Sequence, residues 1–417
     1  MVNESSRKTL EFLWSRALNA VDPRQALRRR LPSWPQGRIV ILGAGKAAAA
    51  MAVEASAFYG ARAAGIAVTR YGHGLRADES AGGLEVVEAG HPLPDAASLG
   101  VGARVLEMVR GLTKVDLVLG LWSGGGSALL EHPLPGVSFD DLRGINAGLL
   151  ASGAAIVDMN AVRKHLSAIK GGRLAAAAFP AHCVSLAISD VPGDDLSVIA
   201  SGPMVPDSTT QAEARAILAR HGLPCPAVLN DAAYETPKPG TLGADAVVIA
   251  RQADALTAAA DAARGLGFSV LDRGTRIEGP AHEIAAFDAR LAIEMTTRGR
   301  PCVILGGGEL GVAGAGAHPG GPNREYALAL ALALRGHPAI SALAADTDGI
   351  DGSDDAAGAF VFPDSLARAK ALGLHAPSML RAHDSGRFFA ALGDALVTGP
   401  TRTNVTDFRA ILVQPAA

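Results

Sequence analysis

Residues 115–130 read VDLVLGLWSGGGSALL, an apolar run that leads into three consecutive glycines between Ser123 and Ser127. The run before the glycines is typical of a buried strand, and the residues after them can begin a helix. Ordering glycine costs more backbone entropy than ordering any other residue, so three together indicate a local benefit. A strand, a glycine turn and a helix N-terminus expose backbone N–H groups to an anion, but a tight turn packed against its neighbours explains the same residues equally well.

Similar units recur along the chain. Strand-like runs followed by glycine-bearing turns and Ala/Leu-rich stretches occur at 38–45, 65–70, 115–122, 183–189, 244–250, 301–308 and 340–349. Strands that are apolar at consecutive positions are buried on both faces, which predicts mainly parallel sheets flanked by helices. The alternation with helices predicts an α/β, doubly wound fold, in which ligands bind beyond the carboxyl ends of the strands.

The chain has 417 residues, more than one compact core usually organises, so we expect two domains. The strand–helix pattern weakens between residues 203 and 245, and TPKPG at 236–240 predicts a hinge there. We therefore expect an N-terminal domain over 1–235 and a C-terminal domain over 236–417. The final AILV run at 410–413 is a strand that can return to either sheet.

Charge and cysteine content restrict the class of protein. A formal net charge of −3 gives no electrostatic reason to expect nucleic acid or an anionic membrane as a partner. Cys183, Cys225 and Cys302 lie far apart without a C-x-x-C pair, which fits a reducing compartment. The N-terminus lacks the apolar core of a signal peptide, and the apolar runs are too short to span a bilayer. We expect a soluble cytoplasmic protein.

The first glycine turn, ILGAGKAAAAMA at 41–52, contains Gly45 and Lys46. It matches a dinucleotide fingerprint superficially, but the following strand ends in Thr69 and Arg70, where an NAD enzyme would carry an acidic residue; Arg70 leaves NADP open. A lysine at a helix N-terminus opposes the helix dipole by roughly 0.3–1 kcal/mol. Lys46 is therefore either a solvated first-turn lysine or, as we favour, a ligand for a carboxylate or phosphate.

Two acidic clusters follow strands. SDVPGDDL at 189–196 contains Asp190 and Asp194, and DTDGIDGSDDAAG at 346–358 contains Asp351. Carboxylates at strand ends beside glycine turns suit Mg²⁺, which is usually held by one or two of them with phosphates and water. Each aspartate alone is better explained as a turn former or helix cap, whereas the clusters together favour a metal.

Three further stretches complete the pattern. The basic segment RKHLSAIKGGRLA at 163–175 contains Lys170 and fits either a phosphate site or a solvated helix face, and we expect His165 to be structural. Glu309 follows three glycines, and TGPTRTNVTD at 398–407 contains Asn404. Any one of these strand ends is an ordinary turn, but a shared site for an anion and a metal explains all of them more economically.

Six stretches together resemble the class II glycerate 2-kinase family: GAGKAAAAMA, LWSGGGSALL, VRKHLSAIKGGRLA, SDVPGDDLSVIASGP, DTDGIDGSDDAAGA and TGPTRTNVTDF. They occur in the family order from residue 43 to 408, and the C-terminal part resembles the MOFRL domain. The resemblance implies transfer of the γ-phosphoryl group of ATP, with Mg²⁺, to the 2-hydroxyl of D-glycerate, giving 2-phosphoglycerate. It also implies two Rossmann-like domains with the active site in the interdomain cleft.

The resemblance carries over to particular residues. Lys46 matches the lysine of the family's first glycine turn. The family's G-G-R-N-x-E reads GGPNRE here, with Pro322 in place of the arginine and Arg324 two residues later. Arg402 stands where the family usually has glycine. We expect Lys46 and Arg324 to contact the transferring phosphoryl group or the carboxylate, and the two departures make a four-carbon sugar acid conceivable.

The remaining roles follow from charge. Asp190, with Asp194 or Asp351, is expected to hold Mg²⁺ or to orient the attacking hydroxyl, so Asp190 is a candidate both as catalytic residue and as metal ligand. The expected substrate- or phosphate-binding residues are Gly45, Ser123, Gly124, Gly125, Gly126, Ser127, Lys170, Glu309 and Asn404.

Two other classes of function remain as alternatives. The first is a hydroxypyruvate reductase that uses NADH or NADPH, which depends on the first glycine turn. The second is a non-catalytic protein that binds a sugar acid or a nucleotide. The expected partners are a small hydroxy acid and ATP, with neither nucleic acid nor a membrane, and a homodimer is one option for the oligomeric state.

Overall fold

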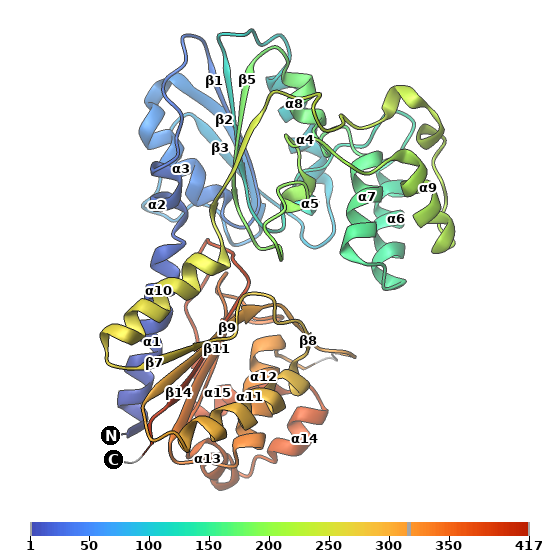
Figure 1. The fold of residues 1–417 in the computed structure, drawn as a ribbon. Coiled ribbons are helices and arrows are strands. Elements are labelled where there is room, and N and C mark those ends of the chain that lie inside the picture. The colour runs from blue at the N-terminus through green and yellow to red at the C-terminus, as the bar shows by residue number, and fades with distance from the viewer. Residues whose placement is uncertain (1, 315–317, 416–417) are drawn as a thin grey trace. The chain divides into compact units, whose positions relative to one another are not determined.

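The computed structural model describes residues 2–314 and 318–415, and the chain divides into two compact units. The first unit is Pro23–Ala250. The second unit combines the first 22 residues with the chain from Arg251 onward. Each unit contains its own sheet with helices packed against it (Figure 1).

The first unit contains a six-stranded sheet in the order β3-β2-β1-β4-β5-β6. All neighbouring strands are parallel. The strands are β1 Ile39–Ala44, β2 Ala63–Arg70, β3 Leu84–Ala89, β4 Leu117–Trp122, β5 His182–Ile188 and β6 Asp245–Ala250. This is the order of a doubly wound sheet, in which the connections reverse direction between β1 and β4. The predicted α/β fold with a parallel sheet is confirmed for this unit.

The first unit carries eight α-helices among its residues: α2 Pro23–Arg28, α3 Ala48–Tyr59, α4 Ala96–Met108, α5 Gly126–Leu129, α6 Phe139–Ala151, α7 Ile156–Leu166, α8 Arg173–Ala178 and α9 Gln211–Arg220. Side chains fix several helix starts. Asp95 begins α4 by accepting a hydrogen bond from the Ser98 N–H, and Ser138 begins α6 in the same way with Asp141.

Helices α6, α7 and α9 lie beside the sheet rather than on it (Figure 1). They enclose a separate apolar cluster of Leu134, Val137, Leu142, Ile145, Leu149, Met159, Ala161, Val162, Leu166, Ala214, Ile217, Leu218, Val228 and Leu229. The first unit therefore contains a helical subdomain with its own core.

The second unit contains a six-stranded sheet in the order β13-β12-β11-β14-β9-β7. Its strands are β7 Ser269–Asp272, β9 Cys302–Gly308, β11 Ile340–Asp346, β12 Gly358–Val361, β13 Ala395–Leu396 and β14 Asp407–Val413, with β8 Gly279–Pro280 and β10 Leu310–Gly311 forming a separate pair. Within the six-stranded sheet only β7 and β9 pair in parallel, and the other neighbours are antiparallel; the separate β8–β10 pair is parallel. The expectation of a mainly parallel sheet is wrong here, because β14 inserts antiparallel between β11 and β9, and an apolar run does not reveal strand direction.

The helices of the second unit are α1 Val2–Ala20, α10 Gln252–Gly265, α11 Ala281–Thr296, α12 Pro322–Leu334, α13 Ser365–Ala371, α14 Ala376–Arg381 and α15 Ser385–Leu392. Helix α12 is buried along most of its length and packs in an apolar cluster of this unit, with residues of α11, β11 and α15. Its N-terminus is therefore held in the protein interior.

The structural division differs from the expected one at both ends. Strand β6 pairs in parallel with β5, so the chain remains in the first unit up to Ala250, beyond the boundary expected at residue 235. Helix α1 belongs to the second unit: its Trp14 ring lies edge-on to Phe408 of β14, with 5.5 Å between ring centroids. Arg7 forms an ion pair of 2.9 Å with Asp394. Local sequence patterns cannot reveal these long-range pairings.

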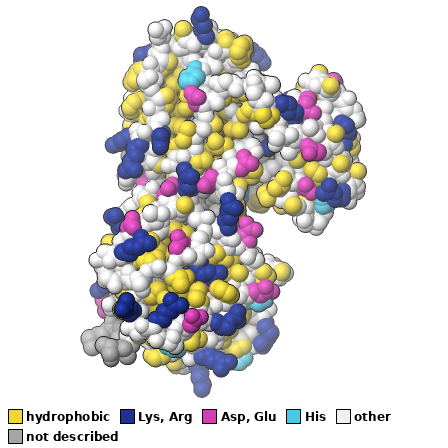
Figure 2. All heavy atoms as spheres, in the orientation of Figure 1, with side chains coloured by type: hydrophobic (Ala, Val, Ile, Leu, Met, Phe, Trp, Pro, Cys, Tyr) yellow, Lys and Arg dark blue, Asp and Glu magenta, His cyan; other side chains and the backbone are white. Residues whose placement is uncertain are grey.

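Lysine, arginine, aspartate and glutamate side chains are interspersed over the face shown in Figure 2, in keeping with the formal net charge of −3. Within the described residues, no helix has both the length and the apolar character needed to cross a bilayer.

We predict that Trp14→Ala destabilises the second unit by about 3–5 kcal/mol, because the buried indole fills the space between α1 and β14. Phe12→Ala is the matched control on the same helix, since the Phe12 side chain is 43 % exposed, and it should change stability little. Chemical unfolding followed by tryptophan-independent circular dichroism measures both. Equal losses for the two variants would contradict the assignment of α1 to this core.

Candidate active site

The turns that follow β1 and β4 are locked together where the sheet order reverses. The Ser123 N–H donates to the Ala44 carbonyl at 3.0 Å, and the Lys46 N–H donates to the Gly124 carbonyl at 2.9 Å. The Ala47 N–H donates to Ser123 Oγ at 3.0 Å. These reciprocal bonds hold both turns at the edge of the sheet where doubly wound folds bind ligands.

Three glycines are required here for separate reasons. Gly45 has φ +131°, and a Cβ on it would lie 2.1 Å from Ser123 Oγ and 2.5 Å from the Ser123 carbonyl oxygen. Gly125 has φ +82° and precedes α5. A Cβ on Gly126 would lie 2.7 Å from the Ala200 Cβ. The glycines therefore permit close packing of the two turns and of the 198–202 segment, in addition to any contact with a ligand.

The expected cradle of backbone N–H groups is smaller than the sequence indicates. The N–H groups of Ser123 and Gly126 donate to the Ala44 and Ser123 carbonyls, so they are already used. No hydrogen bond joins the Gly124, Gly125 or Ser127 N–H to another described residue. These N–H groups are available to bind an anion.

Lys46 and His91 lie beside this turn. Lys46 is half-buried, and its backbone bond to Gly124 fixes the point from which its side chain emerges. The His91 imidazole approaches Gly125 so closely that a Cβ there would lie 3.2 Å from His91 Nε2. Sequence reasoning missed His91; the signal was the GHPLPD stretch at 90–95 directly after β3.

Asp190 and Asp194 follow β5. Both are half-buried, and Asp194 adopts a left-handed conformation with φ +58°. Among the described residues, no group of three or more His, Cys, Asp or Glu side chains forms a metal cage. A Mg²⁺ site usually needs only one or two carboxylates with phosphate and water, so this donor set fits Mg²⁺ delivered with a phosphate ligand.

In the second unit Arg324 and Asp351 bind each other. Asp351 accepts hydrogen bonds from the N–H groups of Asn323 and Arg324, each at 2.9 Å, and from Arg324 Nε at 3.1 Å. Arg324 also donates to Asp354 Oδ2 at 2.7 Å and to the Asp351 carbonyl at 2.5 Å. Both side chains are 1 % exposed.

These contacts bear on two expectations. The Arg324 guanidinium donates from all three nitrogens to the 351–354 loop, so it fastens the start of α12. Both Asp351 oxygens already accept N–H donors, which leaves no fit for a metal ion. Burial raises the pKa of Asp351 to about 6, since it outweighs the attraction of Arg324.

Asp407 extends this buried network and was missed as a candidate. It accepts hydrogen bonds from Asn323 Nδ2 at 2.7 Å, from the Leu310 N–H at 3.2 Å and from Arg409 Nη1 at 3.1 Å. Burial raises the pKa of Asp407 as well. The network joins α12, β10 and β14 at one edge of the second sheet.

Glu309 lies in the loop after the carboxyl end of β9, and Asn404 lies in the loop before the amino end of β14. These two strand ends are neighbours, because β9 and β14 are antiparallel. Glu309 is exposed directly after β9, whereas Asn404 is 4 % exposed. Thr347 fastens the loop of Asn404, because its Oγ1 accepts from the Val405 N–H at 2.9 Å and donates to the Thr406 carbonyl at 2.7 Å. Arg402 is 3 % exposed, so it does not extend into solvent as a long cation at this turn would.

The basic segment 163–175 is neither a solvated helix face nor an open phosphate site. Lys170 is fully buried and forms an ion pair of 2.5 Å with Glu131, and burial lowers the pKa of Lys170. Lys164 pairs with Asp207 at 3.2 Å. The ammonium group of Lys170, which the sequence predicted to bind a ligand, is thus paired with Glu131 in the interior. His165, buried and 2.9 Å from Glu235, is structural as expected.

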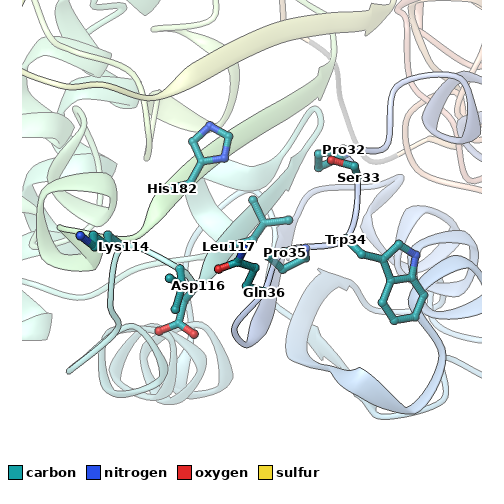
Figure 3. Close-up of a pocket in the computed structure, with 10 residues that line it drawn as sticks. Pro32, Ser33, Trp34, Pro35, Gln36, Lys114, Asp116, Leu117 and His182 are labelled. Carbon is teal, nitrogen blue, oxygen red and sulfur yellow. The ribbon is translucent and has the colours of Figure 1, made fainter.

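A pocket of about 340 Å³ lies at the opposite edge of the first sheet, at the amino ends of β4 and β5 (Figure 3). Its lining includes Trp34, Lys114, Asp116 and His182. Asp116 accepts from the N–H groups of Arg38 and Thr113, and these bonds lower its pKa to about 2. None of the predicted site residues lines this pocket, so it is separate from the glycine turns.

Comparisons with known proteins agree with the fold. Residues 9–232 match a domain of unknown function, DUF4147, and residues 302–407 match the MOFRL family. The chain is 38% identical over 410 residues to a D-glycerate 2-kinase of Thermotoga maritima, covering 97% of each chain. A crystal structure of glycerate kinase from that organism superposes with a TM-score of 0.89, covering 98% of this chain and all of the other. A protein of Agrobacterium vitis named "Putative hydroxypyruvate reductase" is 48% identical over 422 residues, covering 98% of this chain and 95% of its own.

The fold, the glycine turns and these relatives define a phosphotransferase that acts on an alcohol group. More particularly, the chain belongs to the glycerate kinase family whose C-terminal part is the MOFRL domain.

We predict that Gly45→Ala destabilises the first unit by roughly 3 kcal/mol or more, because the new Cβ would collide with Ser123. Gly60→Ala is the matched control: Gly60 also has a positive φ, +58°, but a Cβ there meets nothing within 4 Å. Thermal unfolding of both variants separates the collision from the strain of the backbone. A Gly45→Ala protein no less stable than Gly60→Ala would refute the close approach of the two turns.

We predict that Arg324→Ala lowers stability by about 3–5 kcal/mol, because it leaves Asp351 buried without its partner. Arg300→Ala, at an exposed position of the same unit, is the control and should be nearly neutral. Thermal unfolding measures both. If Arg324→Ala kept full stability and lost only turnover, the stabilising role of Arg324 at the start of α12 would be refuted, and a direct role in catalysis would replace it.

Proposed function

We propose that the chain is an ATP- and Mg²⁺-dependent glycerate 2-kinase that phosphorylates the 2-hydroxyl of D-glycerate. The observation that carries this proposal is the position of Lys46. Lys46 follows Gly45 at the carboxyl end of β1, where the strand connections of the parallel sheet change direction. It lies beside the Gly124 and Gly125 N–H groups. The names of the relatives at 34–38% identity support the same substrate.

The chemistry of phosphoryl transfer fits these groups. The reaction asks the protein chiefly to position reactants and to neutralise oxygens, since little covalent chemistry falls to side chains. Lys46 supplies a cation and the turn supplies backbone donors that need no reorganisation, because the bonds to Ala44 and Ser123 fix the loop. Lys46 is the proposed catalytic residue of the first unit.

Asp190 and Asp194 are the proposed Mg²⁺ ligands. They are half-buried carboxylates at a strand end, as a magnesium site shared with phosphate requires. When bound, Mg²⁺ neutralises phosphate oxygens. Asp190 is also our candidate for orienting the attacking hydroxyl, whereas both oxygens of Asp351 already accept hydrogen bonds within the protein. In the second unit, Glu309 and Asn404 remain proposed substrate contacts.

A hydroxypyruvate reductase is the alternative, favoured by the name of the Agrobacterium vitis relative. Its main sequence support was the glycine turn after β1. The structure gives Gly45 another reason to be glycine, because the Ser123 turn already fills the space beside it. Thr69, at the end of β2 where a ribose-binding carboxylate would stand, is fully buried. A kinase acting on a four-carbon sugar acid also remains open, since Pro322 begins α12 where the family arginine would stand.

The proposed partners are the hydroxy acid and ATP, and the proposed location is the cytoplasm. A homodimer is the proposed assembly to test by size-exclusion chromatography with light scattering.

The proposed function is tested by following ADP release from ATP and Mg²⁺ in the presence of D-glycerate or four-carbon sugar acids, and NADH or NADPH oxidation with hydroxypyruvate. We expect ADP release with D-glycerate that EDTA abolishes, and ³¹P NMR of the product identifies the phosphorylated hydroxyl. ADP release only with a four-carbon acid would change the substrate and keep the chemistry. Nicotinamide oxidation without ADP would overturn the proposal.

We predict that Lys46→Ala lowers kcat by ~10²–10³-fold with unchanged thermal stability, because it removes one preorganised charge from the transition state. Lys114→Ala, in the pocket at the opposite edge of the sheet, is the matched control and should keep wild-type kinetics. Wild-type kcat and KM in Lys46→Ala would remove Lys46 from the site.

A further inference from the structure

A hydrogen-bonded row of three side chains, Ser127, Ser201 and Asn160, leads from the glycine turn into the interior of the first unit. Ser127 Oγ lies 2.8 Å from Ser201 Oγ, and Ser201 Oγ donates to Asn160 Oδ1 at 3.0 Å. Ser201 is fully buried and Asn160 is 4 % exposed, whereas Ser127 is half-buried. Ser127 is therefore the end of this row that reaches the turn.

The order of donors along this row follows from simple counting. A serine hydroxyl has one hydrogen, and an amide oxygen can only accept. Because Ser201 gives its hydrogen to Asn160, it must accept in its bond with Ser127. The Ser127 hydrogen thus points inward, and the acceptor capacity of Ser127 Oγ is left at the turn.

The backbone holds Ser201 in place. Ser201 and Ala200 adopt left-handed conformations with φ of +59° and +52°, which only a well-fixed turn retains. The Ser201 carbonyl accepts from the Gly171 N–H at 3.0 Å. Ala200 packs against Gly126 of the glycine turn, where a Cβ would lie 2.7 Å away. These contacts fix the backbone from which the Ser201 side chain reaches Ser127 and Asn160.

We propose that Ser201 and Asn160 are positioning residues that make Ser127 an acceptor for a hydroxyl group of the substrate. The turn then offers donors from Gly124, Gly125 and Lys46 to a carboxylate, and one acceptor to a neighbouring hydroxyl. That combination matches a hydroxy acid rather than a polyphosphate, whose oxygens would repel an acceptor. The inference rests on the proposed function and assigns its acceptor substrate to this turn.

The variants test the donor and acceptor roles of these three side chains as well as the presence of their hydrogen bonds. Ser127→Ala, Ser201→Ala and Asn160→Ala should each raise the KM for D-glycerate roughly 3- to 10-fold, the usual worth of one hydrogen bond, with little change in the KM for ATP. Asn160→Asp should stay near wild type, because a carboxylate still accepts from Ser201. Equal effects of Asn160→Asp and Asn160→Ala, or a rise in the KM for ATP instead, would overturn the proposal.

Two further variants guard against loss of folding. Ser201→Gly removes the same hydroxyl and relieves the left-handed strain, so it should fold and show the same change in KM as Ser201→Ala. Ser185→Ala is the matched control, since Ser185 is a fully buried serine of β5 whose hydroxyl bonds to no other described residue. It should leave both KM values unchanged; a similar rise in this control would refute the specific role of the row.

Calorimetric binding without ATP separates this inference from the proposed function. D-Lactate and 3-hydroxypropionate each keep the carboxylate and one of the two hydroxyls of D-glycerate. Ser201→Ala should weaken the binding of one of them several-fold and leave the other unchanged. That pattern without turnover of D-glycerate would refute the kinase and keep the positioning role, whereas turnover with neither analogue affected would refute the positioning role alone.

Discussion

The close approach of Gly45 to Ser123 is the constraint on which the first unit depends. Two parallel strands, β1 and β4, end side by side, and their turns must pass within a distance that no side chain on Gly45 tolerates. The bonds from the Ser123 N–H to Ala44 and from the Lys46 N–H to Gly124 then fix both turns against each other. Lys46, His91 and Ser127 all lie in or beside these two turns. The packing of the turns therefore also determines the geometry of the proposed site.

The second unit is organised by buried charge instead. Asp351 and Asp407 lie in the interior, and Asn323, Arg324 and Arg409 supply their donors. Removing two carboxylates from water is costly, and such a cluster persists only when its hydrogen bonds are nearly complete. These bonds fix the start of α12 and of β14. Separately, Thr347 fixes the loop that carries Asn404.

The sequence supported the α/β fold and the parallel sheet of the first unit, because strands buried on both faces and glycine turns are local signals. It did not reveal that β14 runs antiparallel between β9 and β11, or that α1 packs on β14, because these are pairings between residues far apart in the chain. The same limit explains the site. Lys46 could be selected from its turn, but the Ser201–Asn160 chain and the proximity of His91 to Gly125 depend on tertiary contacts that no motif encodes.

Burial explains why residues of one chemical type have different roles. Lys46, Lys170 and Arg324 are all cations beside glycine turns, and the sequence made the first and third catalytic candidates and Lys170 a phosphate-binding candidate. Lys170 faces Glu131 in the interior and Arg324 faces two aspartates, so each already spends its charge on the fold. A cation that is paired with a carboxylate within the protein attracts a phosphate oxygen more weakly. Moving this cation would also leave the buried carboxylate without its partner. Lys46, half-buried beside the point where the strand connections reverse, is the cation of the three that we propose as the ligand contact.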